Sequence, residues 1–270
     1  MAASIHHLTE PAIRCAIGAL HLPAGSRGLD AGCGVGDHAL WLAEAVSPDG
    51  HVTGIDISRD CLHRAQAISS GAHIENQLTL LRGDMNRLPF VDSAFDWAWC
   101  ADALWIGPKS LGFPAERPWP VLNELARVVK PGGVLALLFW SNQLLLPGHP
   151  LLEGRLDATR AANYPYTEDS APEIHIMRTL GWLRDAGLEK PKALTLVADA
   201  QAPLGEIDRD ALAASFQMIW GRAQSELTAD DWEEFQRLCQ PESPDFILNL
   251  PDYYAFITYT LFYGHVPDLR

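Results

Sequence analysis

Apolar residues in the first half of the chain recur at two spacings in turn, in short continuous runs and then at every third or fourth position. Short runs are typical of buried strands, and the wider spacing is typical of amphipathic helices. The pattern predicts a helix at residues 10–20 and then strands that alternate with helices. The expected strands end near Asp30, cover residues 51–58, end before Asp84, cover residues 95–104 and cover residues 134–140.

The alternation stops after Trp140. Residues 141–175 contain several prolines and no clear period, and they are longer than an ordinary connection between a strand and a helix. A helix is expected at residues 176–188 and a strand at residues 192–199, and helical patterns recur within residues 201–250. The aromatic and β-branched run at residues 253–265 predicts a last buried strand.

Strands that alternate with helices favour an α/β fold in which helices cover both faces of a parallel sheet. We expect a doubly wound, mostly parallel sheet of seven strands in a single domain over residues 1–270. Residues 1–22 would form an N-terminal helical cover, and the insertions at 141–175 and 201–250 would form a helical lid over a substrate.

Composition narrows the possible functions. The net charge of −14 disfavours a nucleic-acid partner, because like charges repel. No apolar run approaches the roughly 18 residues of a membrane span, and no signal-peptide pattern is recognised. The five cysteines include no C-x-x-C pair, which indicates reduced thiols and no metal site. We therefore expect a cytoplasmic protein without a membrane span or a metal, as a monomer or homodimer.

The segment LDAGCGVG places Gly32, Gly34 and Gly36 between a predicted strand and a predicted helix. Glycines there let a ligand approach the backbone, and a helix N-terminus presents unpaired N–H groups. A nicotinamide dinucleotide site requires another glycine where Asp37 stands, and Asp30 adds a carboxylate close to the expected pyrophosphate. A ligand that carries an ammonium group suits this loop better, because it attracts the carboxylate.

From this loop to Trp140, the order of motifs resembles the class I S-adenosylmethionine-dependent methyltransferases. LDAGCGVG is similar to the first motif of that family, GIDIS to its ribose-binding segment, and RGDMNRLPF to its adenine-binding loop. FDWAWCADAL is similar to the fourth motif, and LARVVKPGGVLAL to the helix, turn and strand that follow. Within the family, the ordering resembles the small-molecule methyltransferases of ubiquinone and menaquinone biosynthesis. The resemblance implies a Rossmann-like methyltransferase fold and S-adenosyl-L-methionine as cofactor.

The resemblance also implies a role for each residue in this series. The methionine portion of the cofactor would lie near Asp30, Gly32, Gly34 and Gly36, with the backbone of Cys100 beside it. The Asp56 carboxylate would accept hydrogen bonds from the ribose hydroxyls, and the Asp84 carboxylate would accept one from the adenine amine. Ile57 and Met85 would cover the adenine ring. Each of these residues, considered alone, also suits an ordinary turn or core position. The assignment of the cofactor site therefore rests on the order of the whole series of motifs.

Methyl transfer from a sulfonium depends on alignment and on the exclusion of water more than on a dedicated acid. A general base helps when the acceptor must lose a proton, and the candidates are Asp102, His149, His175 and His265. No partner of these residues is evident from the sequence, and surface positions suit the histidines equally well. Trp105, Trp140 and Tyr164 are expected to line the acceptor site, which favours a small, partly hydrophobic acceptor.

Three functions therefore compete at this point. The first is an enzyme that methylates a small molecule with S-adenosylmethionine. The second is a protein that binds the cofactor without transferring the methyl group and acts as a regulatory or scaffold subunit. The third is a nicotinamide-dependent oxidoreductase, against which Asp30 and Asp37 both argue.

Overall fold

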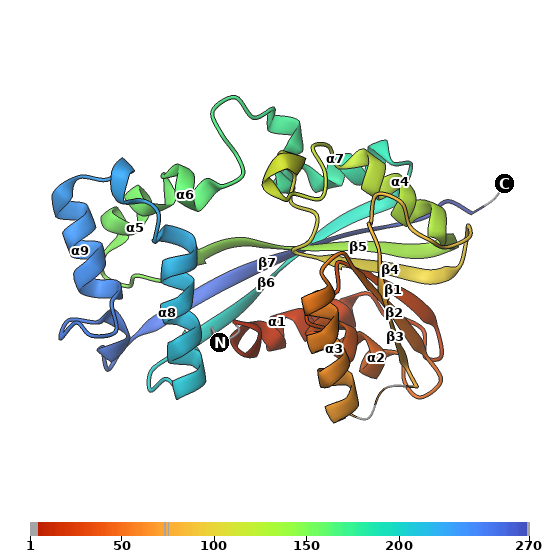
Figure 1. Ribbon diagram of the computed structural model, residues 1–270, viewed down its shortest axis with the longest axis horizontal. Coiled ribbons are helices and arrows are strands. Elements are labelled where there is room, and N and C mark those ends of the chain that lie inside the picture. The colour runs from red at the N-terminus through yellow and green to blue at the C-terminus, as the bar shows by residue number, and fades with distance from the viewer. Residues whose placement is uncertain (1–4, 73, 75, 269–270) are drawn as a thin grey trace. The chain divides into compact units, whose positions relative to one another are not determined.

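The strands form a seven-stranded sheet in the computed structural model, which describes residues 5–72, 74 and 76–268. Their order across the sheet is β3-β2-β1-β4-β5-β7-β6 (Figure 1). Their bounds are β1 (Arg27–Ala31), β2 (His51–Asp56), β3 (Leu78–Arg82), β4 (Phe95–Ala101), β5 (Val129–Leu144), β6 (Glu189–Gln201) and β7 (Tyr254–His265). The α/β fold expected from the alternating pattern is confirmed.

Helices connect most of these strands. The α-helices are α1 (His6–Ala19), α2 (Asp37–Ala45), α3 (Arg59–Ala72), α4 (Trp119–Val128), α5 (Pro150–Asp157), α6 (Arg160–Asn163), α7 (Thr179–Asp185), α8 (Glu206–Trp220) and α9 (Ala229–Cys239). Short 3-10 turns are η1 (Lys109–Leu111), η2 (Pro172–Ile174), η3 (Ile176–Arg178), η4 (Gln224–Glu226) and η5 (Ile247–Asn249). Within the part of the chain that is described, no helix has the length and apolar character needed to cross a bilayer.

The strand order reverses at β1, which pairs in parallel with β2 on one side and with β4 on the other. Asp30, near the carboxyl end of β1, lies opposite Gly54 of β2 and Trp99 of β4. A doubly wound sheet offers a crevice beyond the carboxyl ends of its strands at the point where the order reverses. The ends of β1, β2 and β4 are therefore where this fold would accommodate a ligand.

The last strand runs against the others. The amide of Gly132 donates to the Val266 carbonyl oxygen over 2.9 Å, and the amide of Val266 donates to the Gly133 carbonyl oxygen over 2.9 Å. Further along, the Ser141 hydroxyl donates to the Thr258 carbonyl oxygen over 3.1 Å. From residue 132 to residue 141 of β5, the partner in or beside β7 changes from residue 266 to residue 258. The two strands are therefore antiparallel. The sheet is mostly parallel, as its sequence pattern predicts.

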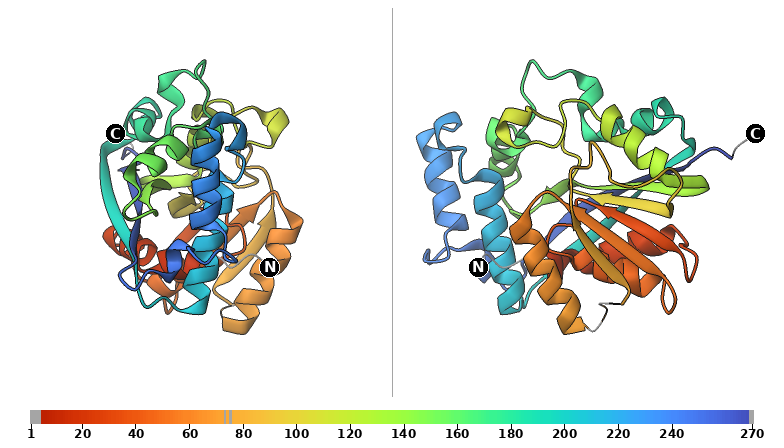
Figure 2. Two further views of the ribbon diagram at one scale, coloured as in Figure 1. Left: turned by 90° about the vertical axis from the view of Figure 1, so that its left-hand side faces the viewer. Right: turned by 45° about the vertical axis from the view of Figure 1, so that its right-hand side comes forward.

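Helices cover both faces of the parallel strands, with α2 and α3 on one side and α4 and α7 on the other (Figures 1 and 2). Helix α4 shows why the sequence folds in this way. Val121, Leu122, Leu125 and Val128 recur at the spacing of one helical face, and their side chains have no exposed area. They join Leu137 of β5 in one hydrophobic cluster.

The described residues group into two compact units. The larger comprises Ile13–Trp140, Ala171–Leu196 and residues 259–268, and it holds the whole series of motifs from the glycine loop to Trp140. The smaller comprises residues 5–12, Ser141–Ser170 and Val197–Thr258. It gathers most of the two segments interpreted as insertions. A single domain with an N-terminal cover and a substrate lid stays a prediction, and residues 1–4 of that cover lie outside the described residues.

Two carboxylates of α5 accept hydrogen bonds from other segments of the smaller unit. Glu153, which is 5% exposed, accepts hydrogen bonds from the main-chain amides of Leu145 and Leu146. Asp157 accepts a hydrogen bond over 2.9 Å from the indole N–H of Trp220 on α8. Burial raises the pKa of both carboxyl groups. Polar side chains thus satisfy the buried backbone that joins β5 to α5.

Residues 141–175, which were expected to form part of a helical insertion, contain α5 and α6. One expectation about the elements was wrong. The sequence Pro131-Gly132-Gly133 was expected to separate α4 from β5, but α4 ends at Val128 and the three residues lie within β5. The register shifts there, since Phe95 pairs with Val129 and Trp97 pairs with Val134. The two glycines therefore lie in an irregular stretch where β5 shifts its register against β4.

The close packing of β1 against β4 gives a first prediction. An added Cβ on Gly28 would lie 2.0 Å from the Trp97 ring, which is itself fixed by a 2.9 Å hydrogen bond from its indole N–H to the Ser26 hydroxyl. Gly28→Ala should lower the free energy of unfolding by about 2 to 3 kcal/mol. Gly18→Ala is the control, because no atom lies within 4 Å of an added Cβ there. It should raise that free energy by about 0.5 kcal/mol, as alanine favours a helix over glycine.

Urea denaturation of the two variants and the parent chain measures both changes. Equal stability of Gly28→Ala and the parent chain would mean that the Trp97 ring can move aside at little cost, contrary to the packing described here.

Candidate cofactor site

The three glycines of the loop after β1 serve different purposes. All have positive φ angles, +80° at Gly32, +52° at Gly34 and +93° at Gly36, which favour glycine over other residues. An added Cβ on Gly32 would lie 2.3 Å from the Ala103 Cβ, and one on Gly36 would lie 2.8 Å from the Ala65 Cβ. No atom lies within 4 Å of such a Cβ on Gly34. Two of the glycines therefore permit close packing, and Gly34 borders open space.

The loop is tied to the end of β2 through Asp56. The Gly34 amide donates to Asp56 Oδ2 over 2.9 Å, and the Ser58 amide donates to Asp56 Oδ1 over 2.8 Å. The amides of Gly32 and Cys33 both donate to the Ile55 carbonyl oxygen, over 2.8 and 3.1 Å. A carboxylate oxygen can accept two hydrogen bonds, so each oxygen of Asp56 keeps capacity for a hydroxyl. Asp56 is thus both fixed in place and able to bind a ribose.

Asp30 is a buried acidic residue near the carboxyl end of β1. Its side chain is 1% exposed, and its Oδ2 has no hydrogen-bond partner among the described residues. Burial raises the pKa of Asp30 to about 8, with a further contribution from the nearby charge of Asp56. A buried carboxylate without a partner is costly. The position therefore suits a cationic ligand, whose charge would stabilise the ionised form.

The loop after β3 begins beside Asp56, since the Gly83 amide donates to the Asp56 carbonyl oxygen over 3.0 Å. Asp84 Oδ1 accepts from the main-chain amide of Asn86 over 2.9 Å and from its side-chain amide over 2.7 Å. Burial works to raise the pKa of Asp84, but the bonds from Asn86 and the charge of Lys109 outweigh it and lower the pKa. Asp84 is therefore ionised at neutral pH.

The two remaining residues expected at the adenine differ in burial. The Ile57 side chain is 67% exposed and next to Asp56 in the chain. Met85 is partly buried against the core, and its Cε would lie 3.1 Å from a Cβ on Gly32. The structure thus brings Asp30, Asp56, Met85 and the glycine loop together at the carboxyl ends of β1, β2 and β3.

The end of β4 forms the other side of the glycine loop. Cys100 is buried, burial raises the pKa of its thiol, and the main-chain amides of Ala103 and Leu104 donate to it. The Asp102 amide donates to the Leu138 carbonyl oxygen over 2.9 Å, and Asp102 Oδ1 accepts from the Trp140 amide over 2.8 Å. Asp102 has a φ of +46°, which is uncommon for a residue other than glycine. It therefore ties β4 to β5, beside the residue that packs on Gly32.

The other candidate side chains lie in both units. Trp105 packs edge-on against Phe139 with a centroid separation of 5.9 Å, and Trp140 lies 6.2 Å from Tyr259, all within the larger unit. Tyr164 belongs to the smaller unit and is 54% exposed. The structure does not gather these three side chains into one described site.

The histidines are likewise divided. His175, in the larger unit, accepts from the Met177 amide through Nδ1 over 3.2 Å, and desolvation lowers its pKa. His149, in the smaller unit, places Nδ1 at 3.0 Å from Glu234 Oε1. His265 Nδ1 lies 3.3 Å from the Gly132 carbonyl oxygen. Whether any of them acts as a base stays a prediction.

Some residues of the site carry no signal of their own in the sequence. Ala103 contacts the glycine loop, but an alanine in a loop indicates no particular role. Ser58 and Asn86 stand two residues after Asp56 and Asp84, which is the spacing of turns that an aspartate side chain closes. That spacing could have been recognised as a device that fixes each carboxylate.

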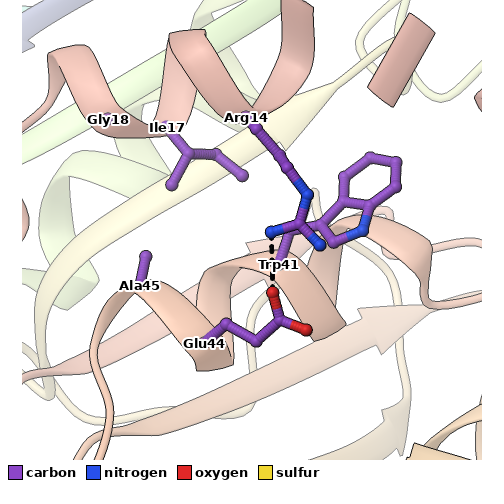
Figure 3. A pocket seen from close by; sticks show the side chains of 6 residues that line it. All are labelled: Arg14, Ile17, Gly18, Trp41, Glu44 and Ala45. Carbon is purple, nitrogen blue, oxygen red and sulfur yellow. Dashed lines mark hydrogen bonds and ion pairs between the residues drawn. The ribbon is translucent and has the colours of Figure 1, made fainter. Parts of the chain in front are cut away.

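A pocket of about 250 Å³ also lies between α1 and α2. Figure 3 shows its lining residues, Arg14, Ile17, Gly18, Trp41, Glu44 and Ala45. The Arg14 guanidinium pairs with Glu44 over 2.6 Å and lies 5.4 Å from the centre of the Trp41 ring. The charges at its rim are matched to each other, and none of its lining residues belongs to the cofactor series.

Comparison with known proteins identifies the family. A model of a methyltransferase domain matches residues 29–133. The 27-O-demethylrifamycin SV methyltransferase of Amycolatopsis mediterranei is 33% identical over 176 residues, which are 65% of this chain and 58% of that protein. The demethylmenaquinone methyltransferase of Bacillus licheniformis is 31% identical over 181 residues, which are 63% of this chain and 73% of that protein. The chain belongs to the class I S-adenosylmethionine-dependent methyltransferases.

A solved structure agrees at the level of the fold. The YcgJ protein of Bacillus subtilis has a TM-score of 0.57 at 18% identity, with 96% of this chain and 100% of that chain covered. Members of the family take the methyl group from S-adenosyl-L-methionine, so the resemblance in the motifs and the cofactor inferred from it are confirmed. Family membership also argues against the nicotinamide-dependent alternative.

The charge of Asp30 in this methyltransferase gives a second prediction. Its pKa is raised from 3.8 to about 8, so the folded protein binds this proton more tightly than the unfolded chain does. Between about pH 4 and about pH 8 the unfolded chain loses this proton while the folded protein keeps it, so the free energy of unfolding decreases progressively as the pH rises. Asp30→Asn should stabilise the ligand-free protein relative to the parent, on the order of a few kcal/mol above pH 8.

Urea denaturation at pH 5, 6.5 and 8.5 measures the difference between the two proteins. The advantage of Asp30→Asn should grow with pH across this range. A difference that does not change with pH would show that the pKa of Asp30 is not raised by folding.

Proposed function

We propose that this methyltransferase transfers the methyl group of S-adenosyl-L-methionine to a small, partly hydrophobic acceptor at the carboxyl ends of β1, β2 and β4. The observation that carries this proposal is the unpartnered, buried oxygen of Asp30 next to the open space at Gly34. An α-amino acid cation fits a position where a carboxylate is desolvated and the backbone can be approached closely. S-Adenosylmethionine carries such a group.

The residues around this point fit the rest of the cofactor. Asp30 would face the ammonium group, and the backbone of Gly32 and Gly34 would border the methionine portion. The Asp56 carboxylate, held by the Gly34 and Ser58 amides, would accept from the ribose hydroxyls.

The base of the cofactor would lie against the loop after β3. Asp84 bonds to Asn86 through Oδ1, so its Oδ2 would accept from the adenine amine. Ile57 and Met85 would cover the ring, with Ile57 supplying exposed apolar surface. Cys100 would contribute backbone and not a nucleophile, since burial raises the pKa of its thiol.

The acceptor is proposed from the relatives and from the aromatic residues near the site. The two relatives are named as methyltransferases of 27-O-demethylrifamycin SV and of demethylmenaquinone, and a small, partly hydrophobic acceptor is consistent with both names. Trp105 follows β4, and Trp140 lies within β5. These two side chains are proposed to contact the acceptor, and whether Tyr164 of the smaller unit takes part stays a prediction.

The bound cofactor supplies an electrophilic methyl group and a neutral leaving group, so the protein must chiefly align the acceptor and exclude water. If the acceptor loses a proton, Asp102 is one candidate base. It directly precedes Ala103, the residue that packs against Gly32 of the glycine loop. His175 has a lowered pKa and so carries a neutral imidazole near neutral pH, which can accept a proton. His149 remains a third candidate, and its Nδ1 lies 3.0 Å from Glu234 Oε1.

Substitutions in the glycine loop test the cofactor site. Gly34→Ala places a methyl group in the open space and should weaken the binding of S-adenosylhomocysteine by at least tenfold. Gly112→Ala is the matched control, because Gly112 also has a positive φ angle, +90°, and no atom within 4 Å of an added Cβ. It carries the same kind of backbone strain and should leave affinity unchanged.

Calorimetric titration measures both affinities, and Asp56→Ala extends the test to the ribose. This variant should lose on the order of 2 kcal/mol of binding free energy, because two hydrogen bonds to a charged group disappear. Native affinity in a folded Asp56→Ala variant would be incompatible with the proposed ribose contact.

Turnover distinguishes an enzyme from a protein that only binds the cofactor. Labelled S-adenosylmethionine and a panel of small hydroxylated and quinone-type acceptors should yield a methylated product and S-adenosylhomocysteine. Tight cofactor binding without product from any acceptor would favour a regulatory or scaffold role.

Alignment should matter more than proton transfer in this reaction. Single-turnover rates with saturating cofactor should fall by no more than about 10²- to 10⁴-fold in His149→Ala, His175→Ala or Asp102→Asn. A larger loss is expected in Asp30→Asn, which removes the charge that holds the methionine portion. A histidine variant that binds both ligands normally and shows no turnover would identify an essential base instead.

A further inference from the structure

We propose that Glu124 and Arg127 of α4 are positioning residues for the adenine end of the cofactor. They would act through the main chain of the loop after β3, residues 83–92, which carries Asp84 and Met85. This inference rests on the proposed function, because it assumes that the loop contacts adenine.

The two side chains form a forked ion pair on the last turns of α4. Arg127 Nε donates to Glu124 Oε1 over 2.8 Å, and Arg127 Nη2 donates to Glu124 Oε2 over 2.8 Å. The hydrogen bond from Arg127 holds the pKa of Glu124 below its usual value. The bonds to Glu124 and Asp92 raise the pKa of Arg127. Such a bidentate pair fixes the geometry of both side chains.

The same pair holds the backbone of the loop at several points. Glu124 Oε2 accepts from the Leu88 amide over 2.8 Å, and Arg127 Nη2 donates to the Leu88 carbonyl oxygen over 3.3 Å. Arg127 Nη1 donates to the Phe90 carbonyl oxygen and to Asp92 Oδ1, over 2.8 Å in each case. These contacts determine the path of the main chain, whatever side chains the loop carries. An ordinary pair of charges on a helix surface would contribute little and would hold nothing else.

The other half of the loop is attached to the cofactor site. Its first residue, Gly83, is bonded to the Asp56 carbonyl oxygen, and the Asn86 side chain donates to the Pro114 carbonyl oxygen over 2.8 Å. Asp84 and Met85 lie between the attachments of Gly83 and Asn86, and the contacts of Leu88 follow two residues later. The loop is thus held on both sides of the residues assigned to adenine.

This arrangement separates the adenine contacts from the rest of the cofactor site. Asp30 and Asp56 stand at the ends of β1 and β2, where the sheet fixes their backbones. Asp84 and Met85 depend on a loop whose second half is held by Glu124 and Arg127. Loss of this pair should therefore impair recognition of the base and leave recognition of the ribose and the amino acid largely intact.

The test compares two ligands that differ only at the base. S-Inosylhomocysteine carries an oxygen where S-adenosylhomocysteine carries the exocyclic amine. The parent protein should bind the adenosyl compound about tenfold more tightly or better, because the inosyl compound places a carbonyl oxygen, an acceptor, against the Asp84 carboxylate where the amine would donate. Arg127→Met should weaken adenosyl binding by about tenfold and inosyl binding by much less, so that the preference is largely lost. In turnover, KM for S-adenosylmethionine should rise while kcat changes by no more than about threefold.

Three further variants make the result specific. Lys130→Met removes another ion pair of the larger unit, Lys130 with Asp96 at 2.7 Å, and should change neither affinity. Glu124→Gln keeps an oxygen that can accept from the Leu88 amide and removes the charge, so it tests the same loop with less risk to folding. It should lose part of the preference. In the Asp84→Ala background, Arg127→Met should cause no further loss of preference, since the two changes act through the same contact.

The possible outcomes separate this inference from the proposed function. A parent protein that binds neither ligand would overturn both. A parent protein that prefers the adenosyl compound supports the proposed function, and the positioning role is then overturned if folded Arg127→Met and Glu124→Gln keep that preference. Equal weakening of both ligands would also overturn it, because it would indicate a general loss of structure.

Discussion

The hydrogen bond from the Gly34 amide to the Asp56 carboxylate joins the two strand ends on which the cofactor site depends. It fixes an anionic group beside a glycine-rich turn that borders open space at Gly34. The bond forms only because β1 and β2 are adjacent and parallel, with Ala31 opposite Ile55. Fold and site are connected at this point, since the register of one strand pair determines where the carboxylate lies.

Close to this hydrogen bond, the buried carboxyl group of Asp30 is energetically unfavourable in the ligand-free protein, and a bound cation would offset that cost. Asp30 is buried without a partner for one of its oxygens, and the charge of Asp56 adds to the cost of ionising it. The remaining polar groups around the loop are well satisfied, as Asp84 and the Asn86 amide show. The cost of the site is thus concentrated on one carboxyl group, the one proposed to meet the cofactor's ammonium.

The sequence predicted the larger unit well, because its elements are local and strongly patterned. The apolar face of α4 and the buried run of β4 are visible from residue spacing alone, and the ordered motifs indicated the cofactor. The spacing of apolar residues does not locate α5 and α6 within 141–175, because contacts outside these helices stabilise them: Glu153 bonds to the Leu146 amide, and Asp157 bonds to Trp220. Glu124 and Arg127 were missed for a similar reason, since their partners lie more than thirty residues earlier in the chain.

The raised pKa of Asp30 also makes the proton a competitor of the cofactor. At neutral pH the ligand-free carboxyl is mostly protonated, because its pKa is about 8. On the proposed placement, the arriving ammonium must displace that proton, so each binding event releases acid to the solution. The apparent affinity for the cofactor should then decrease as the medium becomes more acidic, and the heat of binding should vary with the ionisation enthalpy of the buffer. A single desolvated carboxyl group would in this way link methyl-donor occupancy to the surrounding pH.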